Sequence, residues 1–280
     1  MHIPLAAWFL AAAPGCSVAL GSDDAQCEAD ADCEARGGDF TGSICVEGIC
    51  EEKPEPEDPK WGCIGKVEPA VTEGMVTVTS RFLDLLKNEP PKDVTFKLCN
   101  KYDTPCDAPL GTPEMDAEGD VTVTIPWDLE AYLEMQGPSY YPLLSFLDND
   151  VKVHEANPVV FAVPNVVVGG LASTAGVELD ETKGILLVRM IDCTLQATAG
   201  AAVSIFPTEQ ETRFYTINNT VKADASKTDS SGNSGFVNVS PGAPQVTGMI
   251  APNGKVYGTV STLVRAGHMT AQILQPTPEL

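Results

Sequence analysis

Two short stretches of similar pattern, residues 115–126 and 228–239, place the strongest constraint on the fold. In each, an aspartate comes three residues before a glycine, and a strand-like run follows. Aspartate hydrogen-bonds its own backbone in tight turns and glycine accepts a positive φ, so both stretches predict a turn. After the first turn, Val121, Val123 and Ile125 alternate with threonines, the period-2 pattern of a half-buried strand. The recurrence predicts a mainly β chain with two tandem antiparallel β-sandwich domains.

Runs with the same alternation lie on both sides of each turn, at a spacing typical of β-sandwiches. Between Glu155 and Glu178 the chain is uncharged, but Pro164, Asn165 and Gly169 interrupt it, so a strand and a short packed helix are expected there and not a membrane helix. The second sandwich is expected to fold alone. The predicted organisation is a signal peptide (1–15), a lipid anchor with a cysteine-rich module (16–50), a Pro/Glu linker (51–61), a first sandwich (62–155), a connector with a short helix (156–182) and a second sandwich (183–280).

The amino terminus has the features of an export signal. Residues 3–13 form an apolar run that is too short to span a bilayer but suits a signal-peptide core. Ala13, Pro14, Gly15 and Cys16 follow and resemble a bacterial lipobox, which implies lipidation of Cys16. The alternative is an ordinary secretory signal, with Cys16 removed or left as a free thiol.

The nine cysteines are an odd number, and lipidation of Cys16 leaves eight, enough for four disulfides in an oxidising compartment. Residues 27–50 contain four of them in a segment too short to bury a core, so disulfides must hold it. Three pairings are possible there, and we favour Cys27 with Cys45 and Cys33 with Cys50. A zinc site is less favoured because there is no CxxC motif and no nearby histidine.

Four cysteines remain outside this module. Cys99 and Cys106 flank a hairpin-like loop and are expected to pair across it. Pairing of Cys63 with Cys193 would then clamp the two predicted sandwiches together. In the rival arrangement, Cys63 bonds within the cysteine-rich module and Cys193 stays a buried thiol.

Charge and histidine content exclude several functions. The formal net charge of −22 repels nucleic acid phosphate, so no nucleic-acid partner is expected. His2 lies in the signal, and a catalytic triad would need the isolated His154 or His268, so we predict no catalytic residues, no metal and no cofactor. Trp127, Tyr140 and Tyr141 are the candidates for a sugar-stacking platform, although core and sheet-edge positions are commoner for such side chains.

The second turn, TDSSGNSGF at residues 228–236, resembles the strand–turn motif of carboxypeptidase regulatory-like domains, and residues 115–121 are a weaker copy. This resemblance implies a transthyretin-like fold and an accessory or display module without catalytic residues. With the lipobox and the cysteine-rich module, the whole chain is similar to surface lipoproteins of Gram-negative bacteria. A non-enzymatic protein of the cell envelope is therefore expected, in the outer membrane or at the cell surface. Its expected partners are the membrane, through the lipid, and other envelope proteins or polysaccharide; the alternatives are a carbohydrate- or peptide-binding module and an unrecognised hydrolase.

Overall fold

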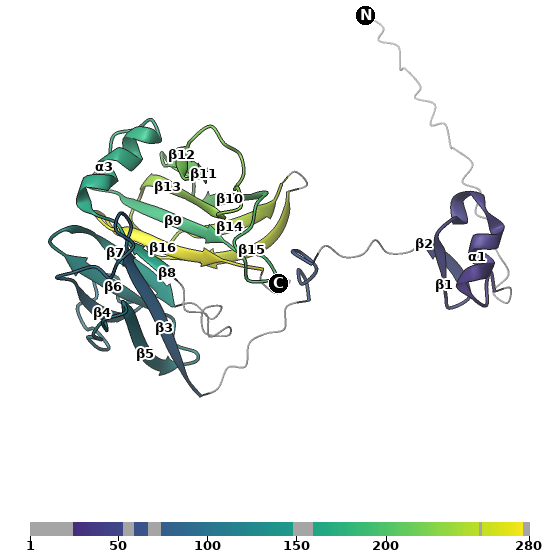
Figure 1. The fold of residues 1–280 in the computed structure, drawn as a ribbon, viewed down its shortest axis with the longest axis horizontal. Coiled ribbons are helices and arrows are strands. Elements are labelled where there is room, and N and C mark those ends of the chain that lie inside the picture. Colours follow the sequence, from purple (N-terminus) through teal and green to yellow (C-terminus); the bar gives the residue numbers. More distant parts are fainter. Residues whose placement is uncertain (1–24, 53–58, 67–73, 148–158, 252–253, 277–280) are drawn as a thin grey trace, which may run out of the picture. The chain divides into compact units, whose positions relative to one another are not determined.

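The computed structural model describes residues 25–52, 59–66, 74–147, 159–251 and 254–276. The chain divides into two compact units, Met1–Glu57 and Asp58–Leu280, which are described separately (Figure 1). Cys16, the signal segment, His154 and most of the predicted linker lie outside the described residues. Among the described residues, no helix is long and apolar enough to cross a membrane.

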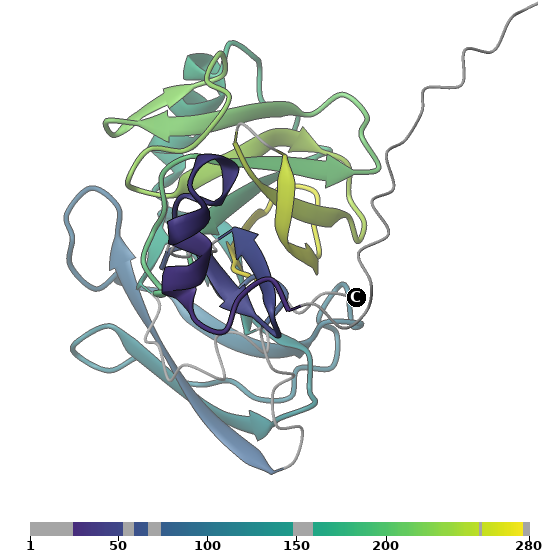
Figure 2. The ribbon, with the colours of Figure 1, turned by 90° about the vertical axis from the view of Figure 1, so that its right-hand side faces the viewer.

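The smaller unit, called the head below, is a helix packed on a hairpin (Figure 2). Its elements are α1 (Asp30–Arg36), a 3-10 turn (Gly38–Phe40), β1 (Ser43–Val46) and β2 (Ile49–Glu52). Glu47 and Gly48 connect the strands with φ values of 49° and 82°, and two consecutive positive φ values suit the twist of a tight hairpin. Two disulfides, Cys27–Cys45 and Cys33–Cys50, join the helix side to the hairpin, in the pairing favoured from the sequence.

Among its described residues, the larger unit consists mainly of strands and has one α-helix, of ten residues. Its first half contains β3 (Met75–Asp84), β4 (Thr95–Asn100), β5 (Asp120–Pro126), β6 (Ala131–Gly137), β7 (Tyr140–Leu147), β8 (Val159–Ala162) and α3 (Asn165–Thr174). Its second half contains β9 (Gly184–Met190), β10 (Ala201–Phe206), β11 (Thr212–Ile217), β12 (Thr220–Lys222), β13 (Asn233–Val239), β14 (Gln245–Ile250), β15 (Lys255–Ser261) and β16 (Met269–Leu274). The prediction of a mainly β fold is confirmed, as is the strand followed by a short helix in the connector.

Both predicted turns are present and have the expected chemistry. The Asp116 carboxylate accepts hydrogen bonds from the N–H groups of Glu118 and Asp120, and Gly119 has a φ of 90°. At the second turn, Asp229 accepts from the N–H of Ser231, and Gly232 has a φ of 65°. A strand follows each turn, β5 in the first case and β13 in the second.

An eight-stranded sheet runs through the whole larger unit in the order β12-β11-β13-β9-β16-β7-β6-β4, which can be followed in Figure 1 from the top of the unit downward. The last strand, β16, lies in its middle and is parallel to both neighbours. Met269 pairs with Leu143 of β7 on one side and with Ile185 of β9 on the other. The final strand of the chain therefore joins the two predicted halves into one sheet.

Two three-stranded sheets, β5-β3-β8 and β10-β14-β15, cover opposite faces of this central sheet. Side chains of a strand point alternately to its two faces. In β9, Ile185 belongs to the core beneath β5-β3-β8, whereas Leu186 belongs to the core beneath β10-β14-β15. In β16, Met269 and Leu274 divide in the same way. Each half is thus a sandwich, as predicted, but the two sandwiches share their central sheet.

This shared sheet changes the meaning of the predicted domain boundaries. Residues 62–155 and 183–280 were expected to form separate sandwiches, yet the central sheet crosses from one range to the other through β16. The segment around Cys63 was expected in the first sandwich but packs on the second core. Trp61 packs on Tyr257 with ring centroids 5.2 Å apart, and Ile64 is part of the second core. The boundaries themselves stay a prediction.

The two disulfides of the larger unit join the pairs expected from the sequence, Cys63–Cys193 and Cys99–Cys106. The first was expected to clamp one sandwich to the other. Because the Cys63 segment packs on the second core, this disulfide instead fastens that segment to the turn after β9, where the N–H of Cys193 also donates to the carbonyl oxygen of Lys60.

Candidate functional site

The aromatic residues considered as a sugar-stacking platform do not form an open surface. Tyr140 is only 6% exposed and belongs to the first core, so a sugar ring cannot stack on it. Tyr141 is half-buried against the same core, and Trp127 is half-buried just after β5. These side chains have the core and sheet-edge positions that the sequence analysis weighed against a platform.

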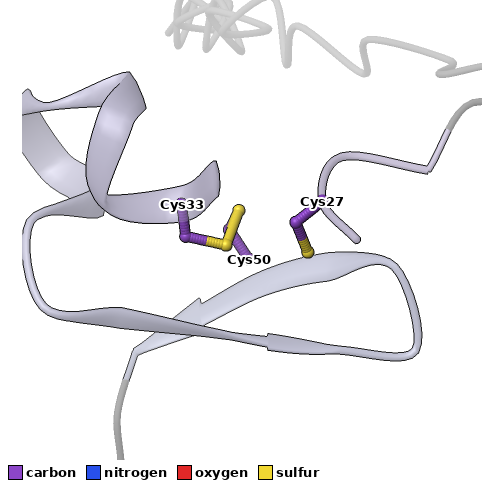
Figure 3. Close-up of side chains that lie close together, drawn as sticks. All are labelled: Cys27, Cys33 and Cys50. Carbon is purple, nitrogen blue, oxygen red and sulfur yellow. A yellow bond between two sulfur atoms is a disulfide. The ribbon is translucent and has the colours of Figure 1, made fainter. Parts of the chain in front are cut away.

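In the part of the chain that the structure describes, two groups of side chains have the composition of a metal site. They are Cys27, Cys33 and Cys50 in the head, and Cys99, Cys106 and Glu134 in the larger unit. Figure 3 shows the first group, with the disulfide between Cys33 and Cys50 and the sulfur of Cys27 beside it. Metal binding by cysteine requires the thiolate. Every cysteine of both groups is in a disulfide, so neither group offers the ligands of a zinc site.

An open hollow of about 590 Å³ lies at one end of the first sandwich. The turn after β3, the β6–β7 connection and the start of α3 line it, through residues that include Asp84, Lys87, Lys92, Ser139, Tyr140 and Val166. Its volume is in the range of small-molecule sites. Its lining mixes both signs of charge, because Glu89 and Asp93 accompany the two lysines.

Asp84 is the buried polar group of this hollow and is 3% exposed. Tyr140 donates a hydrogen bond to one carboxylate oxygen at 2.8 Å, and the N–H groups of Leu86 and Lys87 donate to the other at 2.8 and 3.0 Å. Burial acts to raise the pKa of Asp84, but these hydrogen bonds outweigh it and lower the pKa below its usual value. Asp84 is therefore an ionised, fully engaged group that holds the turn after β3, and this role accounts for its burial.

A second buried cluster joins the two halves of the larger unit. Glu134 of β6 is 1% exposed, and Arg265, from the loop before β16, donates to both of its oxygens at 3.0 Å. His268 and Gln136 complete the surroundings, with Gln136 donating to the same carboxylate. Burial by itself raises the pKa of Glu134, but the hydrogen bonds and positive charge of its neighbours outweigh this effect and lower the pKa to about 2. Glu134 and Arg265 form a bidentate ion pair, the strongest common geometry for such a pair.

His268 is held in one tautomer by this cluster. Its Nε2 lies 2.8 Å from a guanidinium nitrogen of Arg265, and arginine can only donate, so Nε2 accepts. Its Nδ1 lies 2.7 Å from the carbonyl oxygen of Ala266 and is therefore the protonated nitrogen. Both ring nitrogens are engaged, and neither is directed at a nucleophile. The one histidine among the described residues is thus a structural group in this fold.

The Glu134 cluster was not predicted from the sequence. In residues 131–137, Ala131, Leu133 and Met135 share one face of a strand, which places Glu134 on the other and suggests contact with solvent. In the structure both faces of β6 are covered, and residues 131–135 are all buried. A glutamate between the apolar residues Leu133 and Met135 was the available signal. Its partner, 131 residues later, gave none.

Comparisons with known proteins place limits on what can be said of ancestry. No protein-family model matches the sequence, and no curated protein matches it. Solved structures that resemble this chain include the shaft pilin SpaA of Lactobacillus rhamnosus GG, with 13% identity and a TM-score of 0.23 over 75% of this chain and 100% of the pilin. The TIE protein of Bacillus anthracis has 16% identity and a TM-score of 0.23, covering 72% of this chain and 34% of that protein.

A third similar structure is BcpA, the major pilin subunit of Bacillus cereus, with 10% identity and a TM-score of 0.23 over 74% of this chain and 100% of the pilin. TM-scores this low do not establish a common fold. We therefore draw no conclusion about fold or function from these resemblances.

Proposed function

We propose that this chain is a non-enzymatic, lipid-anchored protein of the cell envelope that serves as a structural or interaction module. The set of four disulfides carries the proposal, because it pairs all eight cysteines of the described residues. Disulfides of this kind form and persist in oxidising compartments outside the cytoplasm. The apolar run at residues 3–13 and the lipobox-like residues before Cys16 agree with export and anchoring.

The buried polar side chains that could otherwise suggest catalysis have structural roles. Asp84 is fully hydrogen-bonded in a turn, and Glu134, Arg265 and His268 bond to one another between β6 and the loop before β16. These interactions support a stable scaffold and leave the surface for contacts with partners. The open hollow near Asp84 favours a second candidate function, the binding of a small molecule or peptide.

Substitution of Cys16 by serine tests the anchor. We expect the wild-type protein, expressed in a Gram-negative host, to partition into detergent and to give an amino-terminal peptide that begins at Cys16. This peptide should carry more than one acyl chain, because a single acyl chain holds a protein at a membrane only weakly. The variant Cys16→Ser should remain unprocessed or soluble, while the neighbouring substitution Ser17→Ala should behave like the wild type. An unmodified wild-type peptide, with the same membrane association in both variants, would show that the chain is not a lipoprotein.

A further inference from the structure

The loop that joins β4 to the following bridge, residues 100–111, carries two exposed large side chains. It is called the Tyr102 loop below. Tyr102 is 79% exposed and Leu110 is 52% exposed, although the rest of the fold buries most of its aromatic residues. Exposed tyrosines are a common element of binding surfaces because they offer a large contact area with few rotatable bonds.

Several bonds hold the backbone of the Tyr102 loop. The Cys99–Cys106 disulfide closes it, and Cys106 is 2% exposed. At its far end Leu98 and Gly111 form a bridge, with an N–H to carbonyl distance of 2.8 Å. The hydroxyl of Tyr132, from β6, donates to the carbonyl oxygen of Asp103 at 2.9 Å. The disulfide, the bridge and the hydrogen bond from Tyr132 therefore fix the backbone of the loop at three points.

The side chain of Tyr102 is also fixed, although it points into solvent. Its hydroxyl donates to Glu130 at 2.6 Å, and Glu130 forms an ion pair with Lys101 at 3.2 Å on its other oxygen. The N–H of Tyr102 donates to the side chain of Asn100 at 2.9 Å. A ring held in this way loses little conformational entropy when a partner covers it, so the loop is preorganised for binding.

Charge around the ring selects the class of partner. Beside the ring, Lys101 is paired with Glu130, and Asp103 and Asp107 of the loop add two negative charges, so this surface is net acidic. The whole chain has a formal charge of −22, which opposes contact with a second copy or with an anionic lipid surface. A positively charged partner is attracted instead, and the face of a tyrosine ring binds arginine and lysine.

We propose that the Tyr102 loop docks a basic segment of a partner protein, with an arginine or lysine over the ring of Tyr102 and further basic side chains near Asp107. This inference rests on the proposed role as an interaction module, but it does not depend on the lipid anchor. It names a surface at the end of β4. Neutral polysaccharide gains nothing from the charge of the loop and is the alternative that the experiment must separate.

The full mature chain, with its disulfides intact and labelled with ¹⁵N, is titrated with a capped pentapeptide of alternating glycine and arginine. The same peptide with glutamine in place of arginine is the ligand control, and a neutral cello-oligosaccharide is the polysaccharide probe. We expect the arginine peptide to shift the amide signals of Tyr102 and Asp107 most, and the two other probes to leave them unchanged. The lipid anchor can be left out of this experiment, because the same spectrum shows whether the chain without it is folded.

Matched variants identify the contributing side chains. Tyr102→Ala should weaken binding of the arginine peptide by about fivefold, the size expected for a cation over an exposed ring. Tyr102→Phe should keep most of the affinity, and Phe206→Ala, at a site 72% exposed on β10, should keep all of it. Asp107→Asn should weaken binding more than Asp224→Asn, an exposed carboxylate on another loop.

Three results would overturn the proposal. Signal shifts spread evenly over the acidic surface would mean non-specific attraction, and equal affinities for Tyr102→Ala and Phe206→Ala would remove the ring from the contact. Shifts at Tyr102 with the oligosaccharide, and none with the arginine peptide, would assign the loop to carbohydrate. Failure of lipidation leaves all these readouts in place, so it is distinguishable from failure of the docking surface.

Discussion

Arg265 is the residue whose replacement should most clearly test the account of the larger unit. Its guanidinium donates to both oxygens of Glu134, which is 1% exposed, and the two residues come from different halves of the chain. Arg265→Met removes the partner and leaves a buried carboxylate without its counter-charge. Breaking a buried ion pair on one side costs roughly 3–5 kcal/mol of the free energy of unfolding.

The pH dependence gives a second magnitude for the same cluster. The pKa of Glu134 is about 2 in the folded chain, against a reference value of 4.5. Because the folded pKa is the lower one, ionised Glu134 stabilises the fold above about pH 4.5, and this contribution is lost as the pH falls toward 2. A difference of about 2.5 pH units corresponds to roughly 3 kcal/mol, as an upper value.

Urea unfolding followed by tryptophan fluorescence measures both effects, because Trp61 and Trp127 lie in the larger unit. We expect Arg265→Met to lose roughly 3–5 kcal/mol at pH 7, and the double variant Glu134→Gln with Arg265→Met to recover most of it. Arg81→Met, which breaks a pair whose arginine side chain is 42% exposed, is the control and should cost no more than about 1 kcal/mol.

The loss of stability at acid pH, compared between Glu134→Gln and the wild type, can refute this interpretation. If Glu134→Gln loses stability between pH 4.5 and pH 2 as steeply as the wild type does, the low pKa of Glu134 does not stabilise the fold. A cost below about 1 kcal/mol for Arg265→Met would likewise mean that water or another group replaces the guanidinium.

Two further predictions concern the shared sheet and the second turn. The fragment 184–280, which the sequence pattern predicts to fold alone, should show no cooperative urea transition, because it lacks β7 beside β16 and the core that covers Ile185 and Met269; a sharp transition would restore the independent domain. Gly232→Ala should destabilise the larger unit by more than about 1 kcal/mol, since its φ is 65° and an added Cβ would lie 2.3 Å from the carbonyl oxygen of Met190. Gly169→Ala, in α3 with nothing within 4 Å of the added Cβ, should be neutral or stabilising by up to about 1 kcal/mol in the same assay, and equal effects at both sites would remove the steric argument.

The sequence was sufficient for the features that depend on nearby residues. The turns at Gly119 and Gly232 follow from aspartate and glycine within a few positions, and the strands after them follow from alternation. In the head, the Cys27–Cys45 and Cys33–Cys50 disulfides occur in a short segment with four cysteines, for which only three pairings exist. Each of these features depends on residues that are close together in the sequence, which is the range over which a local pattern is informative.

The candidate site residues were less predictable from the sequence pattern. Tyr140 was available as an aromatic residue that could bind a sugar, and its burial depends on how β7 packs beneath β5-β3-β8. Tyr102 was not singled out, because an exposed tyrosine in a loop has the same sequence pattern as a buried one. Its exposure and its bond to Glu130 appear only when β4 and β6 are paired.

The tertiary structure alone decided which strands are neighbours and which faces are covered. Alternation places Met269, Ala271 and Ile273 on one face of β16 but cannot show that the strand lies between β7 and β9, parallel to both. It also places Glu134 on the face opposite the core, and only the covering of that face makes it a buried partner for Arg265. The physical reason is that alternation is a property of one strand, whereas burial on both faces is a property of the layers stacked around it.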